Sequence, residues 1–116
     1  MDSEALKATE AYSAARSTHP RVSLDDMKSK ISIVHYFTAG EAINALNHPT
    51  LDEKSPLHIL TLCVLVMQNG FTLIGKSAPA SPENFDAEKG RLFAYEDAIK
   101  QLWPLEGYAL REKLSA

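Results

Sequence analysis

Cysteine is nearly absent from the sequence, since Cys63 is the only one in 116 residues. A single thiol cannot form a disulfide within the chain, so a secreted fold held together by disulfides is excluded. Long apolar runs are also missing. The longest, Ile59 to Met67, falls far short of the roughly 20 residues that cross a bilayer. The acidic start, Met1 to Glu4, lacks the apolar core of a secretory signal. We therefore expect a cytoplasmic protein with no membrane span.

The sequence also lacks an excess of charge of one sign. Twelve basic residues stand against fifteen acidic ones, and the net charge is −3. A protein that holds a nucleic-acid backbone needs several converging Lys or Arg side chains, which this balance does not favour. The chain length fits one domain of about 100–150 residues. We expect a single domain over residues 1–116, with residues 1–20 as a helical arm that is flexible or packs on a partner.

Composition and helix-capping residues predict two helices at the start of the chain. Residues 4–17 are rich in alanine and free of Gly and Pro, which favours a helix. Ser23 is a good N-cap with Asp26 as its capping-box partner, so a short helix is predicted over about 24–30.

A strand and a second capped helix are predicted next. The β-branched and aromatic run 31–37 favours a strand, although the sequence does not exclude a helix there. Thr38 and Glu41 form a second capping box that opens a helix to Leu46. Asn and Pro residues over 47–56 then indicate a loop.

Asn69-Gly70 between two apolar runs is the clearest local signal, and it predicts a β-hairpin over about 57–77. A two-residue type I′ turn would place Val66 opposite Leu73. One face of this hairpin is nearly all apolar, and we expect it to be the core. Its residues are Leu60, Leu62, Val64, Val66, Phe71 and Leu73. The half-polar face carries Thr61, Cys63, Leu65, Met67, Thr72, Ile74 and Lys76.

The C-terminal third has a helical period. A helix is predicted over about 84–103, with one apolar sector and an adjacent strip of small residues suited to close approach against a sheet. The sector contains Phe85, Leu92, Tyr95, Ile99, Leu102 and Trp103, and the strip contains Ala87, Gly90, Ala94 and Ala98. Pro104 should end or kink this helix, and a last helix is predicted over about 105–115. The expected fold is α+β: a small antiparallel sheet centred on the hairpin, packed against these C-terminal helices, with an N-terminal helical arm.

Three blocks of the sequence resemble a known family. They are Asn69-Gly70-Phe71-Thr72, Ser81-Pro82-Glu83-Asn84-Phe85-Asp86-Ala87-Glu88 and Leu102-Trp103-Pro104-Leu105-Glu106-Gly107-Tyr108. The chain is similar there to small accessory proteins of tailed bacteriophages and prophages, grouped around one protein each from a coliphage and a Shigella phage. The resemblance covers roughly Leu60 to Leu114 and is looser around His35-Tyr36-Phe37.

Two positions depart from the family pattern. Lys76 stands where an acidic residue is usual, and Pro79 stands where cysteine is common. The resemblance implies a cytoplasmic protein of an infected or lysogenic cell. It supplies no catalytic or binding residues, because the family is functionally uncharacterised.

The sequence gives little support for a catalytic site or a metal-binding site. Cys63 and His58 would point to opposite faces of one strand, so a buried structural thiol is the better interpretation. His19, His35, His48 and His58 lack metal-site spacing, and we expect no metal and no cofactor. The stretch Gly70 to Ser77 fits a phosphate-loop pattern, but it lies in the returning hairpin strand instead of opening a helix.

The candidate contact residues lie on the predicted C-terminal helices. Phe93 sits on a charged face with Lys89 and Lys100, where it could stack a base or anchor a partner. Glu88 falls by helical angle within the apolar sector, where a carboxyl group can act as acid or base; the alternative is a local pair with Arg91.

Trp103 and Tyr108 on either side of Pro104 are either a ligand pocket or ordinary core. A stripe formed by Leu105, Tyr108, Ala109 and Leu114 exceeds what a small sheet can cover, so we expect a homo-oligomer.

The absence of a catalytic constellation, together with the resemblance, favours a non-enzymatic phage accessory protein. We expect it to bind and block a host component, either a host protein or a small nucleotide signal, in the host cytoplasm. One alternative is a nucleic-acid-binding regulator that uses Lys89, Phe93 and Lys100. The other is a small enzyme that uses a buried Glu88.

Overall fold

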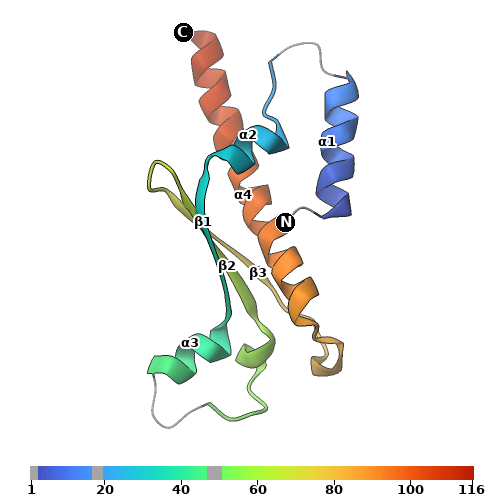
Figure 1. The fold of residues 1–116 in the computed structure, drawn as a ribbon, viewed down its shortest axis with the longest axis vertical. Coiled ribbons are helices and arrows are strands. Elements are labelled where there is room, and N and C mark those ends of the chain that lie inside the picture. Colours follow the sequence, from blue (N-terminus) through green and yellow to red (C-terminus); the bar gives the residue numbers. More distant parts are fainter. Residues whose placement is uncertain (1–2, 17–19, 47–50) are drawn as a thin grey trace.

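A three-stranded sheet and a long C-terminal helix dominate the structure, a computed structural model that describes residues 3–16, 20–46 and 51–116 (Figure 1). The elements in chain order are α1 (Glu4–Arg16), α2 (Leu24–Ser29), β1 (Ile31–Thr38), α3 (Ala39–Leu46), the 3-10 helix η1 (Pro56–Ile59), β2 (Thr61–Met67), β3 (Thr72–Ser77), the 3-10 helix η2 (Pro82–Asn84) and α4 (Ala87–Ser115). The predicted α+β fold is confirmed. Residues 47–50 of the predicted loop lie outside the described residues.

The predicted caps begin the N-terminal elements. Ser23 Oγ accepts a hydrogen bond from the Asp26 amide at 3.0 Å, which opens α2. Thr38 and Glu41 exchange both bonds of a capping box, at 3.1 and 3.0 Å, and open α3. The Thr38 amide bond keeps the pKa of the Glu41 carboxyl below its ordinary value. The strand predicted over 31–37 is confirmed as β1.

The hairpin is present, but its predicted register is wrong by one residue. Val66 lies opposite Thr72, and Leu65 lies opposite Leu73. The loop has three residues, because Met67 donates to the Phe71 carbonyl (2.8 Å) and Gly70 donates to the Met67 carbonyl (2.9 Å). Gly70 has φ +90°, and no other described residue has a positive φ. This is a type I turn followed by a left-handed glycine, and not the type I′ turn that Asn-Gly suggests.

The predicted core face of β2 is also wrong. The buried side chains of β2 are Thr61, Cys63, Leu65 and Met67, and the predicted core residues Leu62, Val64 and Val66 are only half-buried. Both faces of β2 are rich in apolar residues, so alternation alone could not choose between them. The small side chains decide the outcome, because Thr61 and Cys63, with Gly75 on β3, allow the helix to come close.

The two predicted C-terminal helices form one helix, α4, which begins at Ala87 and continues through Pro104. Asp86 caps it by accepting from the Lys89 amide at 3.1 Å, so residues 84–86 precede the helix. Pro104 removes the hydrogen bond to the Lys100 carbonyl. Both residues are exposed, so water can take the place of the missing donor and the helix continues.

The predicted strip of small residues lies against the sheet. A Cβ at Gly75 would stand 2.0 Å from the Ala94 carbonyl oxygen, and one at Gly90 would stand 2.7 Å from Thr61 Oγ1. Ala98 completes the contact, but Ala87 is exposed. Close approach of α4 therefore fixes which face of the sheet becomes the core.

The N-terminal helices complete the core on the same side. Leu6 of α1 and Leu24 and Met27 of α2 are buried with the inner residues of α4. Glu10 holds α1 in place by bonding Arg21 (2.7 Å) and the Leu24 amide (2.8 Å). The Arg21 bond, which is the main cause, lowers the pKa of the Glu10 carboxyl. Within the predicted arm, α1 therefore packs on its own chain.

Candidate functional site

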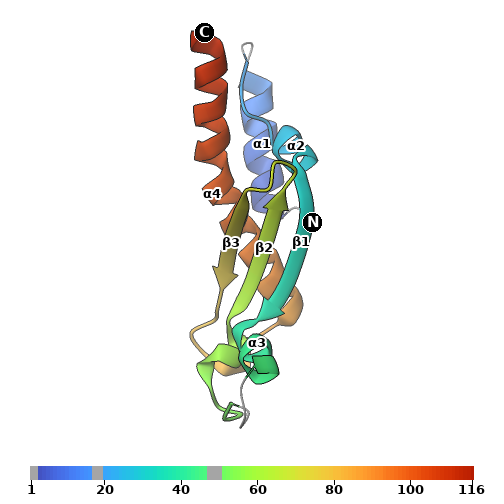
Figure 2. The ribbon, with the colours of Figure 1, turned by 90° about the vertical axis from the view of Figure 1, so that its left-hand side faces the viewer.

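One face of the sheet is covered by no helix of the described residues. Figure 2 shows the three strands toward the viewer, with α1 and α4 behind them and α3 at one end. The register assigns nine side chains to this open face: Ile33, His35 and Phe37 on β1, Leu62, Val64 and Val66 on β2, and Thr72, Ile74 and Lys76 on β3. The side chains of Ile33 and Ile74 are 44% and 57% exposed.

The chemistry of the open face is apolar. Six of its nine side chains are aliphatic or aromatic, and Lys76 is the one Lys, Arg, Asp or Glu among them. An antiparallel sheet that meets water usually alternates apolar residues inward with polar residues outward. A continuous apolar surface on a protein marks an interaction site more often than a random surface does. The open face is therefore the leading candidate surface for binding a partner.

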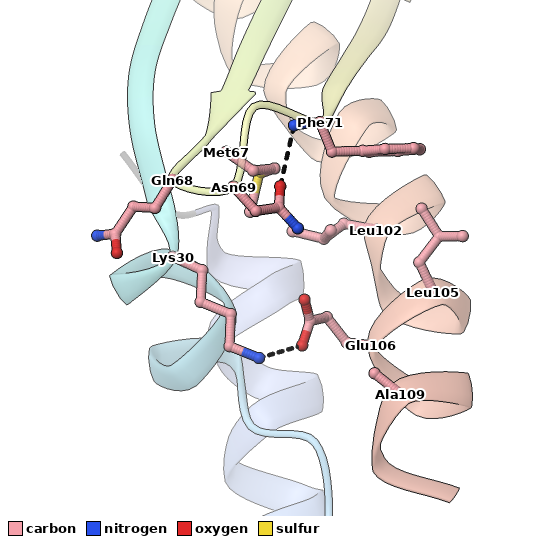
Figure 3. A pocket seen from close by; sticks show the side chains of 9 residues that line it. All are labelled: Lys30, Met67, Gln68, Asn69, Phe71, Leu102, Leu105, Glu106 and Ala109. Carbon is pink, nitrogen blue, oxygen red and sulfur yellow. Dashed lines mark hydrogen bonds and ion pairs between the residues drawn. The ribbon is translucent and has the colours of Figure 1, made fainter. Parts of the chain in front are cut away.

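A groove lies beside the hairpin loop, between the loop and α4 (Figure 3). It encloses about 320 Å³. Met67 and Leu102 are buried in its floor, and the exposed Phe71 and Leu105 form its walls. On the rim, the Lys30 ammonium pairs with the Glu106 carboxylate at 2.5 Å (Figure 3). Two of the sequence blocks that carry the family resemblance, 69–72 and 102–108, meet here.

A second cavity, of about 440 Å³, lies at the α3 end of the sheet. It is lined by Tyr36, Phe37, Thr38, Glu41, His58, Thr61, Phe85, Ala87 and Arg91. The Thr61 hydroxyl is buried and has no hydrogen-bond partner among the described residues. The Arg91 side chain likewise makes no hydrogen bond or ion pair with any other described residue. Its charge is close enough to act on the Tyr36 hydroxyl.

Other groups limit the chemistry of this end cavity. His58 Nε2 donates to the Asp52 carbonyl oxygen at 2.9 Å, which orients the ring. Glu41 also lines the cavity, so the lining contains a carboxylate as well as the Arg91 guanidinium. Phe37 and Phe85 supply aromatic surface. A guanidinium beside aromatic rings can hold a small anion with a planar body.

Cys63 has the environment of a structural thiol. Its side chain is fully buried, and burial raises its pKa to about 11. Burial also raises the pKa of the neighbouring Tyr36 hydroxyl well above its ordinary value. Both groups are neutral at physiological pH, so Cys63 does not present a thiolate nucleophile.

The contact residues predicted on α4 do not form one site. Lys89, Phe93 and Lys100 are exposed together on the outer face of the helix, with Glu96 beside them by helical angle. Two lysines and a carboxylate make a weak positive patch, far from the several converging cations that a nucleic-acid backbone requires.

The sequence left two interpretations open, a buried carboxyl group or a local pair with Arg91 near the helix start, and the structure contradicts the burial of Glu88. Its side chain is exposed, because α4 begins at Ala87 and Glu88 lies in the first turn, outside the packed part of the helix. A carboxylate there is stabilised by the helix dipole and needs no catalytic role.

Trp103 and Tyr108 have separate environments. Trp103 is half-buried against the core, whereas Tyr108 is 71% exposed. The predicted stripe remains uncovered, since Leu105, Ala109 and Leu114 are also exposed.

The described residues form neither a metal site nor a phosphate-binding loop. No group of three or more His, Cys, Asp or Glu residues in residues 3–16, 20–46 and 51–116 could hold a metal ion. His19 and His48 lie outside those ranges. The stretch Gly70 to Ser77 forms the hairpin loop and β3, with Gly75 packed on α4, so it does not open a helix.

Comparison with known proteins decides the family. The family model for "Phage protein (N4 Gp49/phage Sf6 gene 66) family" matches residues 22–114. The chain belongs to this phage protein family. The match confirms the resemblance and extends it to the start of α2. No curated protein and no solved structure was found to match. In the described residues of the phage protein, no helix has the length and apolar character needed to cross a membrane.

Sequence reasoning missed the open face because it assigned the β2 side chains Leu62, Val64 and Val66 to the core and gave the side chains of 31–37 no face. The available signal was that both faces of the hairpin runs carry apolar residues. The described helices α1, α2 and α4 all pack on one side of the sheet, which leaves one such face of the phage protein exposed.

Proposed function

We propose that this phage protein is a non-enzymatic binding protein. It acts in the cytoplasm of the infected cell, binds a host protein through the open face of its sheet, and blocks that protein. The observation that supports the proposal is the uncovered apolar face formed by all three strands. Burial of apolar area is the main driving force of protein association, and this face offers it without rearrangement of the core.

Ile74 is the best residue for testing this surface. Its side chain is 57% exposed on the open face, so a charge there leaves the core intact. Phe93 is a matched control, because it is also large, apolar and about as exposed (51%), but lies on the outer face of α4. The two variants Ile74→Glu and Phe93→Glu change charge and exposed apolar area in the same direction.

The experiment compares host proteins retained by the three immobilised proteins from lysate of the bacterium that carries the phage or prophage. The wild type and Phe93→Glu should retain the same host protein, in amounts comparable with the bait. Ile74→Glu should weaken that complex about 30-fold, as expected when a charge disrupts an interface hot spot. Equal retention by Ile74→Glu, or no host protein retained by folded wild type, would overturn the proposal.

A small nucleotide is the second candidate ligand, favoured by the end cavity. Arg91 has no hydrogen bond or ion pair among the described residues there, and the Thr61 hydroxyl is buried without a partner. In this case the phage protein would sequester a nucleotide signal of its host, with the phosphate on Arg91.

Thermal unfolding with a panel of nucleoside phosphates tests this candidate. A bound nucleotide raises the unfolding temperature as its concentration exceeds the Kd. Arg91→Ala should abolish the rise, whereas Arg111→Ala, which removes an exposed arginine near the C-terminus, should preserve it. The absence of any rise with the wild type would remove the nucleotide candidate and leave the host-protein proposal untouched.

A further inference from the structure

The two outer edges of the sheet differ in how their backbone groups are satisfied. On β3, side chains of α4 cover the edge: Gln101 donates to the Ile74 carbonyl oxygen (2.8 Å), and Asp97 accepts from the Lys76 amide (2.9 Å). These bonds occupy two of the outward backbone groups that another strand would need for pairing, one on Ile74 and one on Lys76. The β3 edge is therefore protected against strand addition.

The edge of β1 lacks this protection along its middle. Antiparallel pairing alternates residues that bond the neighbouring strand with residues that face outward. Because the Ala39 amide bonds the Leu60 carbonyl, the odd-numbered residues Ile33, His35 and Phe37 bond β2, and Val34 and Tyr36 face outward. The Thr38 amide also faces outward, but Glu41 bonds it.

Nothing else in the described chain covers these outward groups. No hydrogen bond from another described element reaches the backbone of Val34 or Tyr36. Ser32, Ile33, Val34 and His35 are all exposed, and Figure 2 shows β1 as the outer strand of the sheet. Residues 31–38 contain none of the Lys, Glu or Pro residues with which proteins commonly guard a free edge.

We propose that β1 pairs antiparallel with the β1 of a second copy of this chain, around a two-fold axis at His35. The two sheets then join into one six-stranded sheet. In a two-fold interface, the same segment of each copy contacts its counterpart. A strand with an open edge can therefore pair with the same strand of a second copy. Val34 lies opposite Tyr36 of the second copy, which engages the outward amide and carbonyl groups of both residues.

The side chains favour this register over its neighbours. On the open face it places Ile33 opposite Phe37 of the second copy, and on the helix face it places Val34 opposite Tyr36. Pairs of a β-branched residue with an aromatic one are among the stabilising cross-strand pairs. A shift by two residues, the smallest that keeps the bonding pattern, places His35 opposite either Ile33 or Phe37 and loses these pairs. The inference does not rest on the proposed function, although the dimer would join the two open faces.

The molecular mass in solution is the first test, by sedimentation equilibrium of the full chain. We expect a dimer. Val34→Pro removes one outward amide without breaking a bond to β2, and proline is tolerated at such an edge position. Each dimer loses two hydrogen bonds, so the dimer Kd should rise about 30-fold while the circular dichroism of the monomer is retained. Tyr108→Glu, which places a charge in the exposed stripe of α4, should leave the dimer intact.

Disulfide trapping is the second test and does not depend on the fold of the proline variant. Opposed residues in a pair that is not hydrogen-bonded have Cα atoms about 4.5 Å apart, which a disulfide can span. His35→Cys should therefore give a covalent dimer on mild oxidation. Ile74→Cys on the same face should not, and the buried Cys63 should stay free in both. A monomeric wild type, or a dimer lost in Tyr108→Glu but kept in Val34→Pro, would overturn the proposal.

Discussion

At the scale of single residues, Gly75 determines how closely α4 approaches the sheet. A Cβ there would lie 2.0 Å from the Ala94 carbonyl oxygen and 2.6 Å from the Ala98 nitrogen, both backbone atoms of α4. Backbone atoms cannot turn aside as a flexible side chain can, so the strand and the helix would have to separate.

Gly75→Ala should lower the free energy of unfolding by about 3 kcal/mol, the upper end of the usual cost of overpacking. Gly107→Ala is its control, because nothing lies within 4 Å of a Cβ there. That change should be neutral or stabilise the helix by up to about 1 kcal/mol. Denaturant unfolding measures both, and similar values for the two variants would contradict the packing described here.

Residue-level prediction from the sequence succeeded where the cause is local. The caps at Ser23 and at Thr38 depend on residues three positions apart, and both formed. The sequence could not decide between a buried and an exposed Glu88, because its burial depended on where α4 begins. Prediction failed at Asn69-Gly70 because the same dipeptide serves a two-residue or a three-residue loop.

At the scale of elements, α4 is continuous where proline was expected to interrupt it. Pro104 sits in the helix interior with an exposed ring. A proline there is about 3 kcal/mol less favourable than alanine, but its restriction of the unfolded chain offsets up to about 1 kcal/mol.

Pro104→Ala should therefore raise the free energy of unfolding by about 2 kcal/mol, since the alanine amide can bond the Lys100 carbonyl. Urea unfolding followed by circular dichroism measures the change. A stability that is unchanged or lowered would mean that the proline ring makes packing contacts that an exposed ring should not make.

The faces of the strands could not be predicted from the alternation pattern. Leu65 is fully buried and Val66 half-buried, although either is suitable for a core. The choice was made by Gly75 and by the small residues Gly90, Ala94 and Ala98, which are distant in sequence from β2. The sequence shows the two faces of each strand and the strip of small residues on the helix. It does not show which strand face packs against that strip.

At the scale of the whole molecule, the two sides of the sheet differ in how the described helices cover them. α1, α2 and α4 supply the core from one side of the sheet, and the other side remains apolar and accessible. The sequence predicted the fold class and the family, because both depend on the order of elements and on contiguous blocks. It placed the candidate contact residues on α4 because it had no means of knowing that one helix layer leaves a sheet face free.

We propose that this phage protein binds its host target at the open face of the sheet. A photo-crosslinking amino acid placed at position 74 or at position 93, in cells that carry the phage, tests the claim directly. Both positions are exposed, but only position 74 is on the open face. We expect one specific host adduct from position 74 and none from position 93. No adduct from position 74, or the same adduct from both positions, would contradict it.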